Sequence, residues 1–194
     1  GIAVLALGFS VVFLPTRVFY VGLAGVFALC PYITSLCLQS GLHMVFASIA
    51  AVIAGVIISV LCELLCHAPL EARDSSAEVH MVASIGVYIV LTQTAALIWG
   101  NQTRMIAMDL ISGLEVGSVT FSPSQLLLGI GSAVILVGFT LFLRSCTLGL
   151  QFRALADNRT EFALRGHNER RLRLLAFGLA GFMASSVSLL MATD

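Results

Sequence analysis

The chain contains 194 residues, of which 59% are hydrophobic and only 10% are charged. Because soluble domains carry about 25% charged residues, this composition excludes a soluble globular enzyme, a disordered protein and a nucleic-acid-binding module. Ten basic residues balance ten acidic ones, and the basic residues are all arginines, which excludes sites built on a P-loop lysine or a Schiff-base lysine.

Six apolar segments follow one another along the chain. A helix crosses a bilayer with roughly 20 apolar residues, and lipid offers backbone groups no partners, so the segments are expected to be helices. The predicted spans are residues 2–14, 18–38, 42–65, 81–99, 125–143 and 174–191. The first segment is short and the chain opens with glycine, which indicates a clipped first helix. The alternative is an uncleaved signal peptide, although no basic stretch precedes the segment. We therefore expect an all-α, polytopic membrane protein with about six transmembrane helices, in which residues 1–194 form one domain.

The second, third and last spans contain packing signals. Pro31 lacks a backbone N–H, so it should free a carbonyl, which at membrane depth usually faces protein. Small residues recur every four positions along one face of two spans. They are Ala47, Ala51, Gly55 and Ser59 in the third span and Ala176, Ala180, Ala184 and Ser188 in the last. Because small residues at this period let helices approach closely in lipid, they favour a compact bundle.

Several ionisable side chains lie near the ends of the spans. Glu63 is expected to reach the membrane surface or to pair locally, and not to relay protons. Solvated or interfacial positions are expected for the four histidines, which are His43, His67, His80 and His167. Cys62, Cys66 and His67 lack the fourth ligand that a closed zinc site needs, so neither a metal nor another cofactor is expected.

Polar side chains interrupt the middle of the fourth span. Thr92 and Gln93 lie deep in it, and Tyr88 lies one turn earlier on the Thr92 face. A buried amide in lipid must find a hydrogen-bond partner, so Gln93 either bonds to another helix or lines a substrate path. Tyr88, Thr92 and Gln93 are therefore candidate substrate-path residues.

The arginines are distributed unequally between the two ends of the spans. Alternating six spans places all of them on one side except Arg104. Since basic residues concentrate on the cytoplasmic side of a membrane, the loops at residues 66–80 and 144–173 are predicted to be cytoplasmic.

The loop at residues 144–173 has the pattern of a short capped helix. Asp157 or Asn158 is a natural N-cap, and Glu161 follows Asn158 at the capping-box spacing. Gly166 is a candidate for the glycine that ends a helix. The pattern predicts a helix of about two turns over residues 159–165.

This helix would carry few apolar groups of its own. Phe162 and Leu164 supply them, and Asn168 can cap a second helix that leads into the last span. A capped helix that projects from a membrane bundle can be bound by another protein. The alternative is a basic loop that only follows the topology rule and contacts anionic lipid headgroups.

Two stretches of the chain match known patterns. The first, residues 149–184, reads GLQFRALADNRTEFALRGHNERRLRLLAFGLAGFMA, and the second, residues 83–100, reads ASIGVYIVLTQTAALIWG. The pattern positions are Arg153, Ala154, Ala156, Asn158, Gly166, Asn168, Ala176, Phe177 and Leu179 in the first and Ile85, Gly86, Leu91, Gln93, Trp99 and Gly100 in the second. Both stretches resemble the branched-chain amino acid permeases, which are membrane subunits of bacterial ABC importers, in a wider family that includes urea and amide permeases. The chain departs from the family where Phe162 separates Glu161 from Ala163, because a tandem alanine pair is usual there.

The resemblance implies a transport subunit without a catalytic site, in the bacterial inner membrane. Its partners would be two cytoplasmic ATP-binding subunits, a second, non-identical permease subunit and a periplasmic solute-binding protein. Its substrates would be branched-chain amino acids or related small polar solutes. The helix that couples to the ATPase would comprise Asp157, Asn158, Glu161, Phe162, Ala163, Gly166 and Asn168. Family chains usually continue with more helices, so the resemblance also implies a truncated chain.

A second function remains open at this point. An ion-coupled secondary transporter or channel would also be an apolar helical bundle, and its basic loop would be only a topology anchor. The two hypotheses differ in whether transport requires a partner ATPase.

Overall fold

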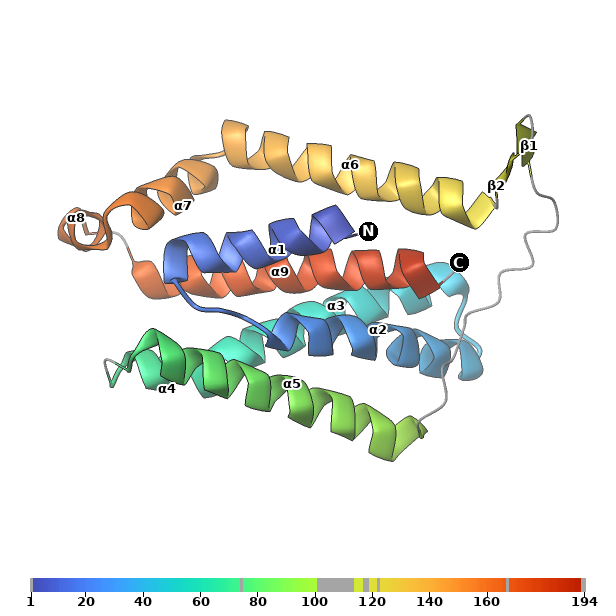
Figure 1. Ribbon diagram of the computed structural model, residues 1–194, viewed down its shortest axis with the longest axis horizontal. Coiled ribbons are helices and arrows are strands. Elements are labelled where there is room, and N and C mark those ends of the chain that lie inside the picture. Colours follow the sequence, from blue (N-terminus) through green and yellow to red (C-terminus); the bar gives the residue numbers. More distant parts are fainter. Residues whose placement is uncertain are drawn as a thin grey trace.

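The computed structural model describes residues 2–73, 75–100, 114–116, 119–121, 123–166 and 168–192. Long helices lie side by side, and the start of α1 and the end of α9 point toward the same end of the bundle (Figure 1). The helices are α1 (Ile2–Thr16), α2 (Gly22–Gln39), α3 (Met44–Cys62), α4 (Ala68–Glu71), α5 (Ala77–Trp99), α6 (Pro123–Ser145), α7 (Thr147–Asp157), α8 (Arg159–Leu164) and α9 (Glu169–Ala192). A π-helical turn, η1 (Glu63–His67), joins α3 to α4, and β1 (Leu114–Val116) pairs antiparallel with β2 (Val119–Phe121).

The prediction of an all-α polytopic fold is confirmed, because all six apolar segments are helical. The individual spans differ in length within the described residues. Four helical segments are long and apolar enough to cross a membrane, and a fifth qualifies if α6 and α7, bent by 79°, form one broken span. Helix α1 has 15 residues, which at about 1.5 Å per residue reach roughly 22 Å, less than the roughly 30 Å of hydrocarbon.

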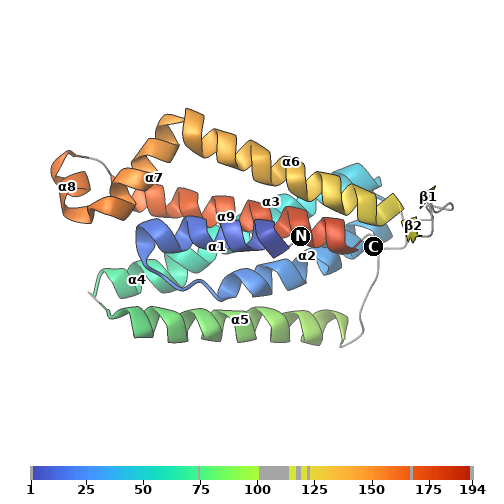
Figure 2. The same cartoon turned by 45° about the horizontal axis from the view of Figure 1, so that its top comes forward.

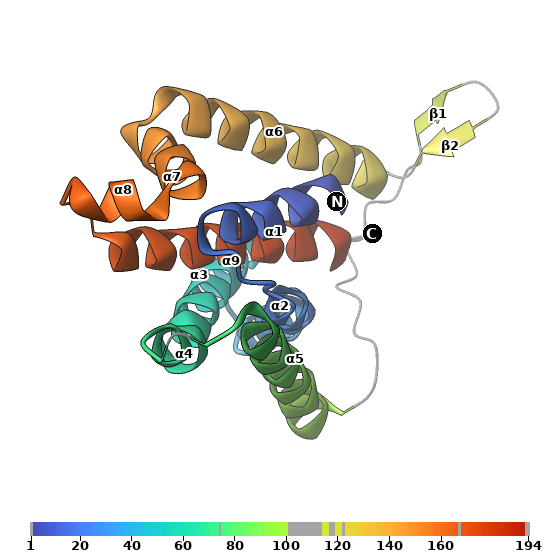
Figure 3. The same ribbon diagram turned by 60° about the vertical axis from the view of Figure 1, so that its left-hand side comes forward.

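Helix α9 lies at the centre of the bundle and α5 at its edge. Helix α9 packs against α1, α2, α3 and α6, whereas α5 packs chiefly against α2. Half of the apolar window of α9 is buried, against 11% for α5. Viewed from the side, α5 stands apart from α6 with α9 between them (Figure 3). Most of the α5 surface is therefore left for lipid or for another protein.

The small-residue faces of α3 and α9 meet each other, as the spacing predicts. Ala47, Ala51, Ala176, Ala180 and Ala184 are each fully buried. The approach is close at Gly181, where an added Cβ would lie 2.9 Å from a backbone oxygen of α3. The two backbones can come this close only because side chains are small along both faces.

The carbonyl that Pro31 frees is satisfied by another helix. Helix α2 continues through Pro31, so the carbonyl four residues earlier, that of Phe27, has no N–H partner from Pro31. The hydroxyl of Ser188 on α9 donates to this carbonyl oxygen at 2.5 Å. The expectation that the freed backbone faces protein is confirmed.

Helix α7 is an element that the sequence analysis missed. It is amphipathic, with Phe152 and Leu155 buried and Arg153 exposed. Its apolar face packs against α1 and α6. A search for runs of about 20 apolar residues passes over such a helix, because polar residues alternate with apolar ones in every turn.

Candidate functional site

Helix α8 is capped as the sequence predicts. The side-chain oxygen of Asn158 accepts a hydrogen bond from the backbone N–H of Glu161 at 3.2 Å. Gly166 follows the helix with φ of +76°, a left-handed conformation that favours glycine after a helix end. The side-chain oxygen of Asn168 accepts from the N–H of Arg171 at 3.2 Å and so caps α9. These caps define both ends of a short, separately built helix.

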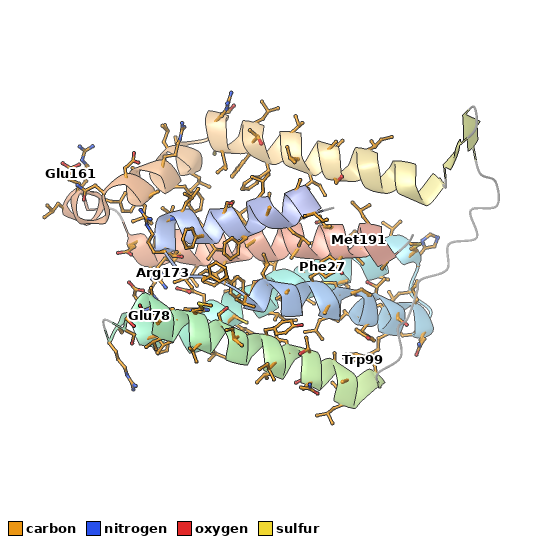
Figure 4. All side chains as sticks on the ribbon, in the orientation of Figure 1. Phe27, Glu78, Trp99, Glu161, Arg173 and Met191 are labelled. Atoms are coloured by element: carbon orange, nitrogen blue, oxygen red, sulfur yellow. The ribbon has the colours of Figure 1, made fainter. Side chains whose placement is uncertain are left out.

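Helix α8 projects from the end of the bundle. In Figure 4 the labelled Glu161 lies at the tip of the molecule, beyond the first turns of α9. Phe162 is only 4% exposed and belongs to the core, whereas Leu164 is 82% exposed. One buried aromatic ring thus anchors a helix whose outer face is exposed at Leu164. Asp157, the last residue of α7, is also exposed. Ala163 lies in α8, and its side chain is not among those that the structure describes.

Helices α7 and α8 enclose a groove at this tip. The groove has a volume of about 360 Å³, and its lining includes Leu150, Ala154, Asp157, Asn158 and Phe162. Apolar and polar side chains both line it. Such a groove can receive a side chain from a partner protein.

The two loops predicted to lie on one side of the membrane do lie at one end of the bundle. The α4–α5 turn and the α7–α8 segment share the end opposite to the hairpin (Figure 2). Seven of the ten arginines belong to residues 144–173, so positive charge gathers at this end. The connection at residues 66–80 is itself largely helical, because the end of η1, α4 and the start of α5 occupy most of this stretch.

The candidate substrate-path residues lie on the edge helix α5. Gln93 is exposed, Tyr88 is 36% exposed, and the hydroxyl of Thr92 donates to the carbonyl of Tyr88 at 2.9 Å. Gln93 is therefore not buried in the chain by itself, and both alternatives for it, a hydrogen bond to another helix and a place in a substrate path, stay predictions. The physical reason is that α5 packs chiefly on α2 through its other face, so a path lined by Gln93 would need a second subunit.

A buried charge cluster, formed by Glu63, His67, Glu71, His80 and Arg173, lies near the same end of the bundle. The Nε atom of Arg173 bonds Glu63 Oε1 at 2.8 Å, and Nη1 contacts Glu71 Oε2 at 2.5 Å. His80 Nε2 lies 3.6 Å from Glu71 Oε2, and His67 Nδ1 lies 3.2 Å from His80 Nδ1. Glu63 and Arg173 are 1% and 3% exposed, so this ion pair is almost completely desolvated.

Three members of the charge cluster lie where their sequence positions did not predict them. His67 and His80 were expected to be solvated, yet they are 0% and 4% exposed. Glu63 was expected to reach the surface or pair locally, yet its partner Arg173 is 110 residues away. The reason is that α3, η1 and α4 continue as one long helical segment, Met44–Glu71, which contacts α5 and α9 where a solvated loop was expected.

An aromatic cap covers the inner side of the charge cluster. The Tyr20 ring lies 4.7 Å from the Phe177 ring and 5.9 Å from the His67 ring, measured between centroids. Its hydroxyl lies 3.3 Å from the hydroxyl of Ser59. Tyr20 is fully buried, so its ring separates the cluster from the apolar core.

A signal for the charge cluster was present in the sequence. The four-residue spacing of the buried α3 face continues from Ser59 to Glu63, His67 and Glu71. In a regular α-helix this spacing drifts around the axis, because a turn takes about 3.6 residues. The π turn at Glu63–His67 takes more residues per turn and returns these side chains to the buried face. Extending the stripe beyond the apolar residues would have predicted their burial.

The comparison with protein families finds one match over the whole chain. Residues 1–194 match the family described as the permease component of the branched-chain amino acid transport system. Searches of curated proteins and of solved structures found no match.

Proposed function

Because the chain belongs to the family of branched-chain amino acid transport permease components, we propose that it is a membrane-spanning permease subunit of a bacterial ABC importer. It lies in the inner membrane, with residues 66–80 and 144–173 in the cytoplasm. Separate ATP-binding subunits drive it, a periplasmic solute-binding protein delivers the substrate, and a second, non-identical permease subunit completes the path. The chain needs no catalytic site, because its partners hydrolyse the ATP.

The observation that carries this proposal is the geometry of α8. Its caps at Asn158 and Gly166 fix both ends, and Phe162 anchors it to the core while Leu164 faces outward. A helix held in this way moves as a rigid body, whereas an uncapped loop would absorb a push. We assign the coupling role to α8 with its flanking residues Asp157, Asn158, Gly166 and Asn168, and with Glu161, Phe162 and Ala163 inside it.

The substrate path is assigned to the exposed face of α5. Tyr88, Thr92 and Gln93 occupy consecutive turns of a helix that is mostly uncovered in the single chain. A second subunit against α5 would remove this face from lipid and place polar groups between two bundles. Branched-chain amino acids and related small polar solutes suit a path that combines such polar groups with apolar surroundings.

Leu164 allows the coupling role to be tested without altering any charge. In a complex reconstituted into liposomes with its ATP-binding subunits, Leu164→Ser should weaken binding of the ATPase and reduce ATP-dependent uptake. Leu65→Ser is the matched control, because Leu65 is 72% exposed at the same end but lies on η1. A topology anchor depends on charge and would tolerate both substitutions equally.

The proposal fails in two recognisable ways. If uptake continues without any ATP-binding subunit and follows an ion gradient, the chain is a secondary transporter or channel. In that case α8 belongs to a basic loop that serves only as a topology anchor. If the ATP-binding subunits stay bound and coupled when residues 159–164 are replaced by a Gly/Ser linker, another element makes the contact.

A further inference from the structure

We propose that Arg173 is the positioning residue that transmits movement of α8 to α3, α4 and α5; this inference rests on the coupling role proposed for α8. Helix α8 ends at Leu164 and α9 begins at Glu169, so only a short capped connection separates the two. Arg173 lies near the start of α9 and enters the bundle there (Figure 4). A displacement of α8 therefore reaches Arg173 before it reaches any other buried charge among the described residues.

Arg173 holds two elements at once. Its Nε atom bonds Glu63 on η1 at 2.8 Å, and its Nη1 atom contacts Glu71 on α4 at 2.5 Å. The guanidinium is planar, and its donors have a fixed geometry. A shift of α9 therefore cannot preserve both contacts unless η1 and α4 follow it.

The ion pairs continue from α4 to α5. Glu71 Oε2 lies 3.6 Å from His80 Nε2 near the start of α5. His80 also contacts His67 on η1 through the two Nδ1 atoms, 3.2 Å apart. Apart from its contacts with η1, α5 packs chiefly against α2. The charge cluster therefore connects α9 directly to α5, the helix that carries Gln93.

Some polar atoms of the charge cluster lack hydrogen-bond partners in the part of the chain that the structure describes, and open space lies beside them. Within the described residues, Glu63 Oε2 and Arg173 Nη2 are buried without a hydrogen-bond partner. A pocket of about 690 Å³ opens beside them, lined in part by Glu63, Glu71, Asn168 and Arg173. Glu63 also begins a π turn, an irregularity found frequently at functional sites. Free donor and acceptor positions beside open space allow Arg173 to change carboxylate contacts when α9 shifts.

A buried ion pair adds little to the free energy of folding, because removing two charges from water costs about as much as their attraction gains. Replacing a buried ion pair by well-packed apolar residues is often neutral or stabilising. The double variant Glu63→Leu/Arg173→Met therefore removes the charged link while filling similar volume. Arg173→Lys is the conservative variant, because an ammonium group keeps the charge but cannot reproduce the two-pronged contact. Arg171→Met is the control, since Arg171 is exposed two residues away.

The experiment uses the complete complex, with its ATP-binding subunits and binding protein, in liposomes. The readouts are ATPase co-purification, ATP hydrolysis and substrate transported per ATP. We expect co-purification and hydrolysis near wild-type levels in every variant. Substrate transported per ATP should fall about tenfold in the double variant, fall less in Arg173→Lys, and remain unchanged in Arg171→Met.

The outcomes separate this inference from the function on which it rests. If wild-type uptake needs no ATPase, the proposed function fails. If wild-type uptake is ATP-coupled and both variants transport as much substrate per ATP as the wild type, Arg173 has only a structural role and the inference is overturned. If the double variant does not assemble, Arg173→Lys decides alone, because a lower transport ratio in an assembled complex has no purely structural explanation.

Discussion

The close approach of α3 and α9 predicts that two glycines three positions apart respond differently to the same substitution. An added Cβ at Gly181 would lie 2.6 Å from Ser59 Oγ and 2.9 Å from the carbonyl oxygen of Gly55. At Gly178 the nearest atom would be Val60 Cγ2, at 3.6 Å. Contacts between carbon atoms are optimal at about 3.5–4.0 Å. Gly181→Ala therefore pushes two backbones apart, whereas Gly178→Ala makes an ordinary contact.

The magnitude follows from the difference between the two variants. Alanine favours a helix over glycine by about 1 kcal/mol, and this gain is common to both positions, so it cancels in the comparison. Overpacking a well-packed interior costs about 1–3 kcal/mol. Gly181→Ala should therefore be less stable than Gly178→Ala by about 1–3 kcal/mol, which for a chain of this length lowers Tm by about 2–12 °C relative to the control.

Thermal unfolding of the purified subunit in detergent measures this difference. Cys30 and Cys62 are buried in the fold, so a thiol-reactive fluorescent dye reports their exposure as the bundle opens. The reasoning is refuted if Gly178→Ala lowers Tm as much as Gly181→Ala does. It is equally refuted if Gly181→Ala unfolds clearly above the wild-type temperature.

Three further substitutions test the packing and the caps. Ser188→Ala should lower the free energy of unfolding by about 1 kcal/mol, because it removes the donor to the freed α2 carbonyl. The loss should be clearly smaller in a Pro31→Ala background, which restores a backbone N–H. Equal losses in both backgrounds would contradict that hydrogen bond. Asn158→Ala should speed amide hydrogen exchange in α8 about fivefold, because an N-cap is worth about 1 kcal/mol; unchanged exchange would mean that the cap is unimportant. Gly149→Ala should destabilise the α6–α7 corner by about 3 kcal/mol, since its Cβ would overlap a carbonyl at the end of α6. Gly138→Ala meets open space and should not lower Tm in the same thermal assay, because alanine favours the helix by about 1 kcal/mol.

The sequence predicted the elements that depend on local chemistry. The caps at Asn158 and Asn168 were predicted because a capping side chain reaches only its own helix. The freed carbonyl followed from Pro31 for the same reason. The meeting of the two small-residue faces needed one further assumption, that such faces attract each other in lipid, and the structure supports it.

The candidate site was predicted less completely. Helix α8 was expected, but α7 was not, because its alternating polar and apolar residues resemble a loop in a search for long apolar runs. The burial of His67 and His80 was missed because histidines near the ends of spans are usually solvated. The burial of His67 follows from the four-residue spacing that continues the α3 face. The burial of His80 depends on η1 packing against α5, which the residues of neither segment reveal separately.

Composition and spacing alone determined that this chain is a bundle of apolar helices with small-residue contact faces and a capped helix in an arginine-rich segment. Each of these properties is decided within one segment, by hydrophobic length, by helical periodicity or by a side chain that bonds its own backbone. Only the tertiary structure decided that Arg173 meets Glu63 across 110 residues of sequence, and that Gln93 faces outward from an edge helix. Burial and ion pairing depend on which two segments pack against each other, so they are determined only by the tertiary arrangement of the helices.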